Sequence, residues 1–212
     1  MKDKIFLFDF DGTMFDSMSV WEHLGSLYLH EKGLLVHSEV DKILSTMTFN
    51  EGVEYLNTKY LPQLSLDEIE REMKDLLTNY YLEKVLPKNS ILSFLQQAYT
   101  LGIPLYILSA GEKELIIKVL KKYNIDTLFE EIYMCNDLHL NKKTKAIYHY
   151  LGKLLNVSSD QIYVFEDVYY AAKSAKEAGC KVIGVQDAYQ DAMIKEIVDI
   201  YISDFMELEE IL

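Results

Sequence analysis

Apolar residues along the chain fall into short continuous runs, separated by segments with the three-to-four-residue spacing of helices. Each run has the length of one buried strand, and the runs lie at 5–8, 104–109, 131–135, 161–165 and 181–185. Apolar strands that alternate with helices are typical of a parallel sheet covered on both sides. The pattern therefore predicts an α/β core with a doubly wound, Rossmann-like parallel sheet, and a short extra strand at 201–202.

The segment between the first two predicted strands has helical periodicity and no convincing strand. Within it, Ser65-Leu-Asp-Glu68 has the form of a capping box at the start of a long helix. A helical block placed after a single strand indicates an insertion. We therefore expect a core domain formed by 1–15 and 86–212, with an all-helical cap domain at 16–85. Helices that simply cover the sheet would produce the same pattern, and the sequence leaves that alternative open.

The chain has 212 residues and a formal net charge of −13 at pH 7. This acidity disfavours a nucleic-acid partner, because no basic patch would dominate the field. An anionic substrate has to be attracted locally, by a metal ion, helix N-termini or a placed lysine. Cys135 and Cys180 have no metal-binding spacing and are expected to be reduced core thiols. Without a signal peptide or a membrane-length apolar run, we expect a cytoplasmic protein with no membrane partner; the oligomeric state is not predictable.

The first predicted strand ends in two acids, Asp9 and Asp11, with Phe10 between them and Gly12 directly after. Aromatic neighbours predict burial, and buried carboxylates have to be paired or bound to a metal. Because Gly12 turns freely, we expect Asp9 to stay at the mouth of the strand while Asp11 lies on the turn. The two carboxylates can then take different roles at an acidic metal site.

Polar residues also follow other predicted strands: Ser109 after the second, and Glu166 and Asp167 after the fourth, with Lys142 at the start of the helix before it. The carboxyl ends of parallel strands share one edge, where ligands bind. Four acids at one edge repel one another unless a cation neutralises them, and all-oxygen ligands favour Mg²⁺. The Ser109 hydroxyl and the amide of Ala110 offer an anion site. These are the parts of phosphoryl transfer through a carboxylate nucleophile.

In this order, the segment Asp9-Phe-Asp-Gly-Thr13, Ser109, Lys142 and the pair Glu166-Asp167 resemble the four signature motifs of the haloacid dehalogenase (HAD) superfamily. The resemblance extends over essentially the whole chain. The helical block between the first two motifs is similar to the cap of the phosphatase and β-phosphoglucomutase-like branch.

The resemblance implies a role for each motif acid. Asp9 is implied to be the nucleophile that forms an aspartyl-phosphate. Asp11 is implied to be the general acid that protonates the leaving group and then the base that activates water. Mg²⁺ would be held by the carboxylates of Asp9 and Asp167 and the backbone carbonyl of Asp11, with Glu166 assisting.

The phosphate-binding residues implied by the resemblance are Ser109, Ala110 through its amide, and Lys142. Here the chain departs from the family. Many relatives have Lys-Pro at the third motif, whereas this chain has Lys142-Lys143. Lys143 and Lys145 therefore remain alternatives to Lys142. Many relatives also have asparagine or a second serine where this chain has Ala110.

The function implied is a Mg²⁺-dependent phosphatase, a phosphoric monoester hydrolase acting on a small phosphorylated metabolite. The alternative is a phosphosugar mutase of the β-phosphoglucomutase type. Such mutases grip a second phosphate with a cap arginine, and the one arginine here, Arg71, lies mid-helix, which favours the phosphatase. A dehalogenase has no use for Asp11 or the metal acids, and a non-catalytic relative would usually lack one of them. The substrate depends on cap side chains and is not predicted.

Overall fold

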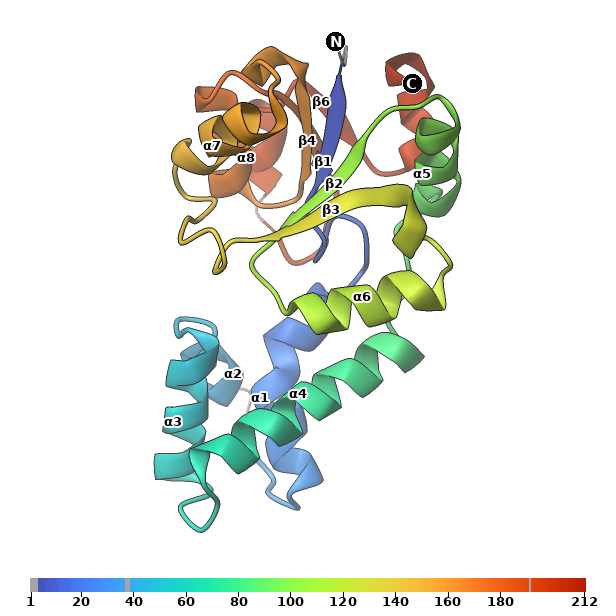
Figure 1. The fold of residues 1–212 in the computed structure, drawn as a ribbon. Helices are drawn as coiled ribbons and strands as arrows, with labels where there is room; N and C mark the ends of the chain where they lie inside the picture. The colour runs from blue at the N-terminus through green and yellow to red at the C-terminus, as the bar shows by residue number, and fades with distance from the viewer. Residues whose placement is uncertain (1–3, 37–38, 191) are drawn as a thin grey trace. The chain divides into compact units, whose positions relative to one another are not determined.

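The protein is described by a computed structural model that covers residues 4–36, 39–190 and 192–212 (Figure 1). The chain divides into two compact units. The sheet unit consists of Met1–Asp16 and Leu86–Leu212, and the helical unit of Ser17–Val85. Over the described residues, none of the helices is long and apolar enough to span a membrane.

The sheet has six strands in the order β3-β2-β1-β4-β5-β6, and every neighbouring pair is parallel. The predicted doubly wound fold is therefore confirmed. After β3 the chain returns to the other side of β1, and this reversal opens the crevice at the strand ends in which such folds bind ligands. The strands are β1 (Ile5–Phe8), β2 (Leu105–Ser109), β3 (Phe129–Met134), β4 (Ile162–Glu166), β5 (Lys181–Val185) and β6 (Ile200–Ile202).

Helices cover both faces of the sheet, with α7 and α8 on one side and α5 on the other (Figure 1). The α-helices of this unit are α5 (Ile91–Thr100), α6 (Lys113–Lys122), α7 (Ala146–Leu155) and α8 (Tyr169–Glu177). Short 3₁₀ helices complete the unit: η1 (Asp126–Leu128), η2 (Ser159–Gln161), η3 (Ala192–Glu196) and η4 (Phe205–Ile211).

Aromatic side chains fill one face of the central strands. Phe6 and Phe8 of β1 pack with Phe165 of β4 and Phe94 of α5, and Phe205 of η4 packs in turn against Phe94 and Phe165. The rings of Phe8 and Phe165 stack with centroids 4.2 Å apart. The alternate side chains of β1 point to the opposite face and join a second apolar cluster with α7 and α8. Because β1 is buried on both faces, packing fixes the position of its backbone. The acids that follow β1 therefore start from a fixed position.

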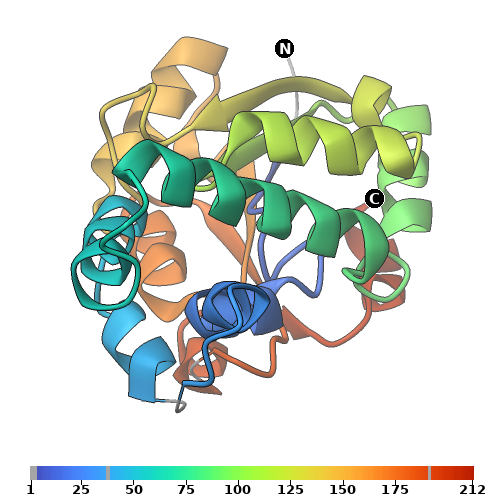
Figure 2. The same cartoon turned by 90° about the horizontal axis from the view of Figure 1, so that it is seen from below.

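The helical unit contains α1 (Met18–Glu31), α2 (Glu39–Leu44), α3 (Phe49–Lys59) and α4 (Leu66–Glu83). In Figure 2, α1 is seen almost end-on, whereas α4 is seen along its length. The capping box predicted at Ser65 and Glu68 is formed, and Thr48 and Glu51 form another at the start of α3.

The sequence misplaced the start of α7. A helix was predicted from position 142, but α7 begins at Ala146, and Lys142 lies in the preceding turn. The side chain of Asn141 accepts a hydrogen bond from the amide of Lys143 at 3.0 Å, a local contact that competes with helix formation. Lys142 therefore lies on a turn, so its side chain is not confined to one face of a helix.

The two chain segments that join the units are paired with each other inside the sheet unit. Phe15 and Pro87 form an antiparallel bridge, and the amide of Asp16 donates to the carbonyl of Leu86 at 2.9 Å. Beside this bridge, Nζ of Lys88 contacts Asp16 at 2.5 Å and Asp187 at 2.9 Å. Lys88 and Asp187 are nearly buried, with 10% and 3% of their side chains exposed. A buried ion pair therefore links these two paired segments to the segment that follows β5.

Replacing Lys88 with methionine is expected to lower the free energy of unfolding by about 3 kcal/mol, because the buried carboxylate of Asp187 loses its counter-charge. Urea denaturation followed by circular dichroism measures the change. Lys118→Met, at an exposed position of α6, is the matched control and should change stability by less than about 0.5 kcal/mol. Equal stability of the two variants would show that the buried pair contributes nothing.

Candidate active site

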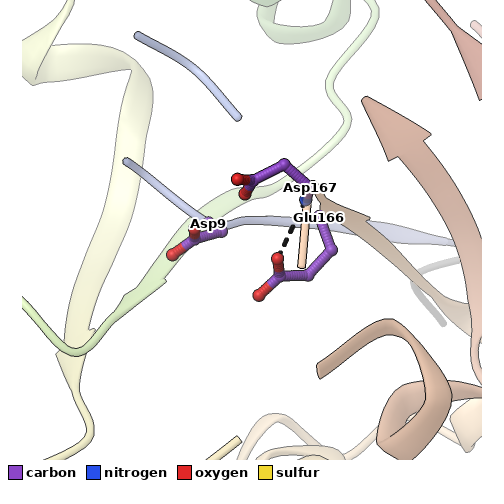
Figure 3. Close-up of side chains that lie close together, drawn as sticks. All are labelled: Asp9, Glu166 and Asp167. Carbon is purple, nitrogen blue, oxygen red and sulfur yellow. Dashed lines mark hydrogen bonds between the residues drawn. The ribbon is translucent and has the colours of Figure 1, made fainter. Parts of the chain in front are cut away.

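The carboxyl ends of β1 and β4 bring three acids together. The amide of Asp9 donates to the carbonyl of Phe165 at 2.9 Å, which holds Asp9 beside Glu166 and Asp167. One carboxylate oxygen from each acid lies within 4.8 Å of those of the other two. Figure 3 shows the three side chains at these neighbouring strand ends. The predicted acidic edge is thus a compact cluster.

Lys142 is the lysine that enters this cluster. Its Nζ donates to Oδ1 of Asp9 and, at 2.8 Å, to Oε1 of Glu166. The Lys142 side chain is 9% exposed, whereas Lys143 and Lys145 are exposed to solvent. One buried ammonium therefore bridges two of the three acids.

The other carboxylate oxygens of the β4 acids have unequal surroundings. Oε2 of Glu166 accepts from the amides of Asp167 and Val168, and Oδ1 of Asp167 accepts from the hydroxyl of Thr13 at 2.8 Å. Oδ2 of Asp167 is buried and has no hydrogen-bond partner within the part of the chain that the structure describes. Sequence reasoning assigned no role to Thr13, although its place directly after Asp-Gly in the first motif was a signal for one.

Burial controls the protonation of this cluster. It raises the pKa of Asp9 to about 7, with Glu166 and Asp11 adding to the rise and Lys142 opposing it. Burial, with Glu166 and Asp9, likewise raises the pKa of Asp167 well above its usual range. Burial alone would lower the pKa of Lys142, but Asp9 and Glu166 outweigh it and raise that pKa. The single positive charge of Lys142 is therefore insufficient to offset the burial and mutual repulsion of the acids.

The cluster fits a hard divalent cation. The three acids supply only oxygen ligands, the set that Mg²⁺ and Ca²⁺ prefer. A buried carboxylate oxygen without a donor costs free energy unless something binds it, and Oδ2 of Asp167 is such an oxygen among the described residues. A cation there would also stabilise the charged forms of Asp9 and Asp167 against the burial and the neighbouring carboxylates that raise their pKa values.

Asp11 is not one of the three clustered acids, and its carboxylate lies against the turn that follows β2. A Cβ atom built on Gly111 would lie 3.3 Å from Oδ2 of Asp11 and 3.3 Å from Oγ of Ser109. The amide of Gly111 donates to Oγ of Ser109 at 3.0 Å, and Ala110 between them is exposed. The carboxylate of Asp11 and the hydroxyl of Ser109 therefore flank one turn, and a larger residue than glycine would crowd both.

A doubly wound parallel sheet thus brings carboxylates, a lysine and a serine together at its strand ends. The chain belongs to the haloacid dehalogenase-like hydrolase family, whose sequence model matches residues 6–185. It is therefore an enzyme of that family. No curated protein matches the sequence significantly.

Several solved structures share this fold. A predicted phosphoglycolate phosphatase from Haemophilus somnus 129PT is 19% identical, with a TM-score of 0.79, over 100% of this chain and 98% of that one. CbbY from Rhodobacter sphaeroides, in complex with phosphate, is 19% identical, with a TM-score of 0.79, over 99% and 97%. YfnB from Bacillus subtilis, bound to magnesium, is 17% identical, with a TM-score of 0.78, over 100% and 99%. At these identities the likeness concerns the fold.

Proposed function

We propose that the protein is a Mg²⁺-dependent phosphatase that hydrolyses a small phosphomonoester through an aspartyl-phosphate on Asp9. The observation that best supports this proposal is the buried contact of Lys142 with Asp9 and Glu166. Beside it, Oδ2 of Asp167 has no hydrogen-bond partner among the described residues. A nucleophilic carboxylate repels a phosphoryl group unless cations flank it. Lys142 on one side and a metal ion on the other would make that approach possible.

In the first step, a carboxylate oxygen of Asp9 attacks phosphorus and the bond from phosphorus to the leaving oxygen breaks. Asp11 donates its proton to that oxygen, so the product leaves as a neutral alcohol. The carboxylate of Asp11 lies beside the Ser109 turn and is not one of the three clustered acids, which supports this division of roles. The products of the step are the alcohol and a phosphorylated Asp9.

In the second step, Asp11 takes a proton from a water molecule whose oxygen attacks the phosphorus of the aspartyl-phosphate. The bond from phosphorus to Asp9 breaks, inorganic phosphate forms, and the carboxylate of Asp9 is restored. The proton that Asp11 gains restores its acid form for the next turnover. One group thus serves as acid and then as base.

Ser109, the amide of Ala110 and Lys142 bind the oxygens of the transferring phosphoryl group in this proposal. The Oγ of Ser109 already accepts from the amide of Gly111, so its own hydrogen can be directed to a phosphoryl oxygen. Lys142 carries three hydrogens on Nζ and uses two on Asp9 and Glu166. The third can reach the phosphoryl group at the same edge.

The residues that would hold Mg²⁺ are Asp9 and Asp167 through carboxylate oxygens and Asp11 through its backbone carbonyl, with Glu166 assisting. When bound, Mg²⁺ supplies charge neutralisation for the phosphoryl group and its carboxylate nucleophile. Thr13 fixes Asp167 so that Oδ2 remains available. The magnesium held by YfnB, a protein of similar fold, agrees with this metal.

We also propose that the helical unit, at about 16–85, acts as a cap that supplies contacts to the substrate. A phosphosugar mutase would have to hold a second phosphate with an arginine of this unit. The one arginine of the chain, Arg71, is exposed on α4. The phosphatase is therefore the better assignment.

The function is tested by phosphate release from p-nitrophenyl phosphate. The purified protein is expected to turn over with Mg²⁺ and to stop when the metal is chelated. In the same preparation, saturating Mg²⁺ is expected to raise the melting temperature by about 5–10 °C, because it binds the folded state only.

Asp167→Asn is expected to abolish most of this thermal shift, since asparagine keeps the oxygen that accepts from Thr13 and removes the charge that binds the cation. Asp137→Asn, at an exposed acid outside the cluster, should retain the shift. Melting temperatures with and without Mg²⁺ provide the measurement. A full shift in Asp167→Asn would remove this residue from the metal site, and turnover without any metal would contradict the proposed function.

A further inference from the structure

The turn before α7 carries two consecutive lysines whose side chains have different surroundings. Lys142 is buried and its Nζ contacts Asp9 and Glu166, whereas Lys143 is exposed. Nζ of Lys143 lies 5.8 Å from the ring centroid of Tyr170, which is within the range of a cation–π contact. Tyr170 is itself half-exposed. The proposed mechanism uses neither Lys143 nor Tyr170.

The contact between α7 and α8 places this pair beside the strand-end acids. The two helices lie on the same face of the sheet (Figure 1), and the hydroxyl of Tyr148 on α7 donates to the carbonyl of Ala171 on α8 at 3.2 Å. Along the chain, α8 begins two positions after Asp167, an acid of the cluster. Tyr170 follows that acid by three positions, and Lys143 directly follows the lysine of the cluster. The pair therefore lies at the solvent-exposed rim of the candidate active site.

The hydroxyl of Tyr170 lies within the electric field of the acidic cluster. Burial raises the pKa of Tyr170, Glu166 adds to the rise and Lys142 opposes it. Asp9 and Asp167 raise the same pKa further. At physiological ionic strength charges act over about 8 Å, and the ammonium beside the Tyr170 ring is closer to it than that. This ammonium can therefore act on an anion that approaches the cluster.

The segment that carries Lys143 has a charge opposite to that of the whole chain. The chain has 34 acidic residues and 21 lysines and arginines. Between Asp137 and Asp160, however, the sequence contains four lysines and no acid. The net charge of −13 repels a phosphate dianion, whereas this segment attracts one. An anionic substrate is thus drawn to the part of the sheet unit in which Lys142 and Lys143 lie.

We propose that Lys143, positioned by the ring of Tyr170, binds the phosphate group of the substrate at the rim before that group reaches Lys142 and Asp9. The inference rests on the proposed phosphatase function and adds a substrate-binding residue to it. It names the substrate class as phosphomonoester dianions, because one ammonium attracts a dianion about twice as strongly as the monoanion of a phosphodiester. Lys143 stands where the chain departs from the Lys-Pro pattern of many relatives.

Lys143→Met is expected to lower kcat/KM for p-nitrophenyl phosphate by about three- to tenfold at an ionic strength of about 0.02 M. One unit charge that acts on a dianion at about 6 Å in water has an effect of this size. The value of kcat should change by less than about twofold, because the bound phosphoryl group is held by other residues. At about 1 M salt, where the Debye length is about 3 Å, the variant and the native protein should have the same kcat/KM.

Two further variants identify the charge of Lys143 as the cause. Lys153→Met removes the same charge from the last turn of α7 and should leave kcat/KM within about twofold of native. Lys143→Arg keeps the charge and can stack on an aromatic ring, so it should restore native kcat/KM. Equal losses in Lys143→Met and Lys153→Met would overturn the proposal. A loss in Lys143→Met that persists at about 1 M salt would also overturn it, since a structural role has no such salt dependence.

Tyr170→Leu tests the positioning role of the ring. Without the ring the ammonium of Lys143 is no longer held at the rim, so kcat/KM should fall by about two- to threefold at low ionic strength. Tyr99→Leu makes the same change at an exposed position of α5 and should have native kcat/KM. Native kcat/KM in Tyr170→Leu would contradict positioning by this ring.

Binding of inorganic phosphate tests the inference without turnover. Calorimetric titration of the full-length protein with Mg²⁺ present is expected to give a Kd about three- to tenfold higher in Lys143→Met at low ionic strength, and a native Kd in Lys153→Met. If Lys143→Met weakens phosphate binding while no phosphomonoester is hydrolysed, the phosphatase function fails and the rim site stands. If Lys143→Met and the native protein bind phosphate and hydrolyse the ester equally, the function stands and the rim site fails.

Discussion

Replacing Asp9 with asparagine is expected to lower kcat for phosphate release by at least about 10⁴-fold, because the amide cannot form the aspartyl-phosphate. Folding should survive the change. Asp9 is buried next to two further acids, and removing its charge relieves repulsion, while Oδ1 can still accept from Lys142. Phosphate release from p-nitrophenyl phosphate at saturating Mg²⁺ measures the loss, and circular dichroism verifies the fold.

Asp160→Asn is the matched control for this experiment, since it makes the same change at an exposed acid of η2. It should retain native kcat. Acid quenching during turnover with ³²P-labelled substrate should trap a covalent phosphoryl-enzyme in the control and none in Asp9→Asn. Turnover of Asp9→Asn within about tenfold of native would show that another group attacks phosphorus, even if Mg²⁺ dependence is retained.

Replacing Asp11 with asparagine is expected to separate the two half-reactions. The variant has no proton to give to the leaving oxygen and no base to activate water, so turnover of an alkyl phosphate should fall by about 10²–10⁴-fold. p-Nitrophenolate leaves readily without a proton, so the first step with p-nitrophenyl phosphate should remain fast. The result is a rapid burst of p-nitrophenolate, equal to the enzyme concentration, followed by slow turnover.

Stopped-flow absorbance measures this burst, with Asp160→Asn again as the control that shows native kinetics. The trapped phosphoryl-enzyme should accumulate in Asp11→Asn, because its hydrolysis is the impaired step. Equal losses for alkyl and aryl phosphates, without a burst, would exclude Asp11 as the general acid. In that case its position beside Gly111 would serve the shape of the Ser109 turn instead.

Much of the sheet could be predicted because strand formation follows local patterns. The continuous apolar runs around Phe8, Ile107 and Phe165 predict buried strands, and these three residues are register partners in the parallel sheet. The boundary errors arose where a contact interrupts the local pattern. At the start of α7, the turn around Lys142 replaces the predicted first helical residues.

The sequence by itself determined the α/β class, the placing of Asp9, Ser109 and Glu166-Asp167 at strand ends, and the family resemblance. Hydrophobic periodicity and the motifs predict these features because each strand and each motif is defined by residues that are close in the sequence. Only the tertiary structure decided that Lys142 contacts Asp9, 133 positions away, while Lys143 and Lys145 face solvent. It likewise decided that Thr13 bonds Asp167 across 154 positions.

A cavity of about 270 Å³ in the helical unit is another feature that only the tertiary structure decided. Its methionines, Met18, Met47 and Met73, lie on α1, the α2–α3 turn and α4, and the sequence shows only that each is apolar. Whether inward-facing side chains fill the interior or leave a space depends on how the four helices pack. That packing is a property of contacts between distant segments, so no local pattern in the chain records it.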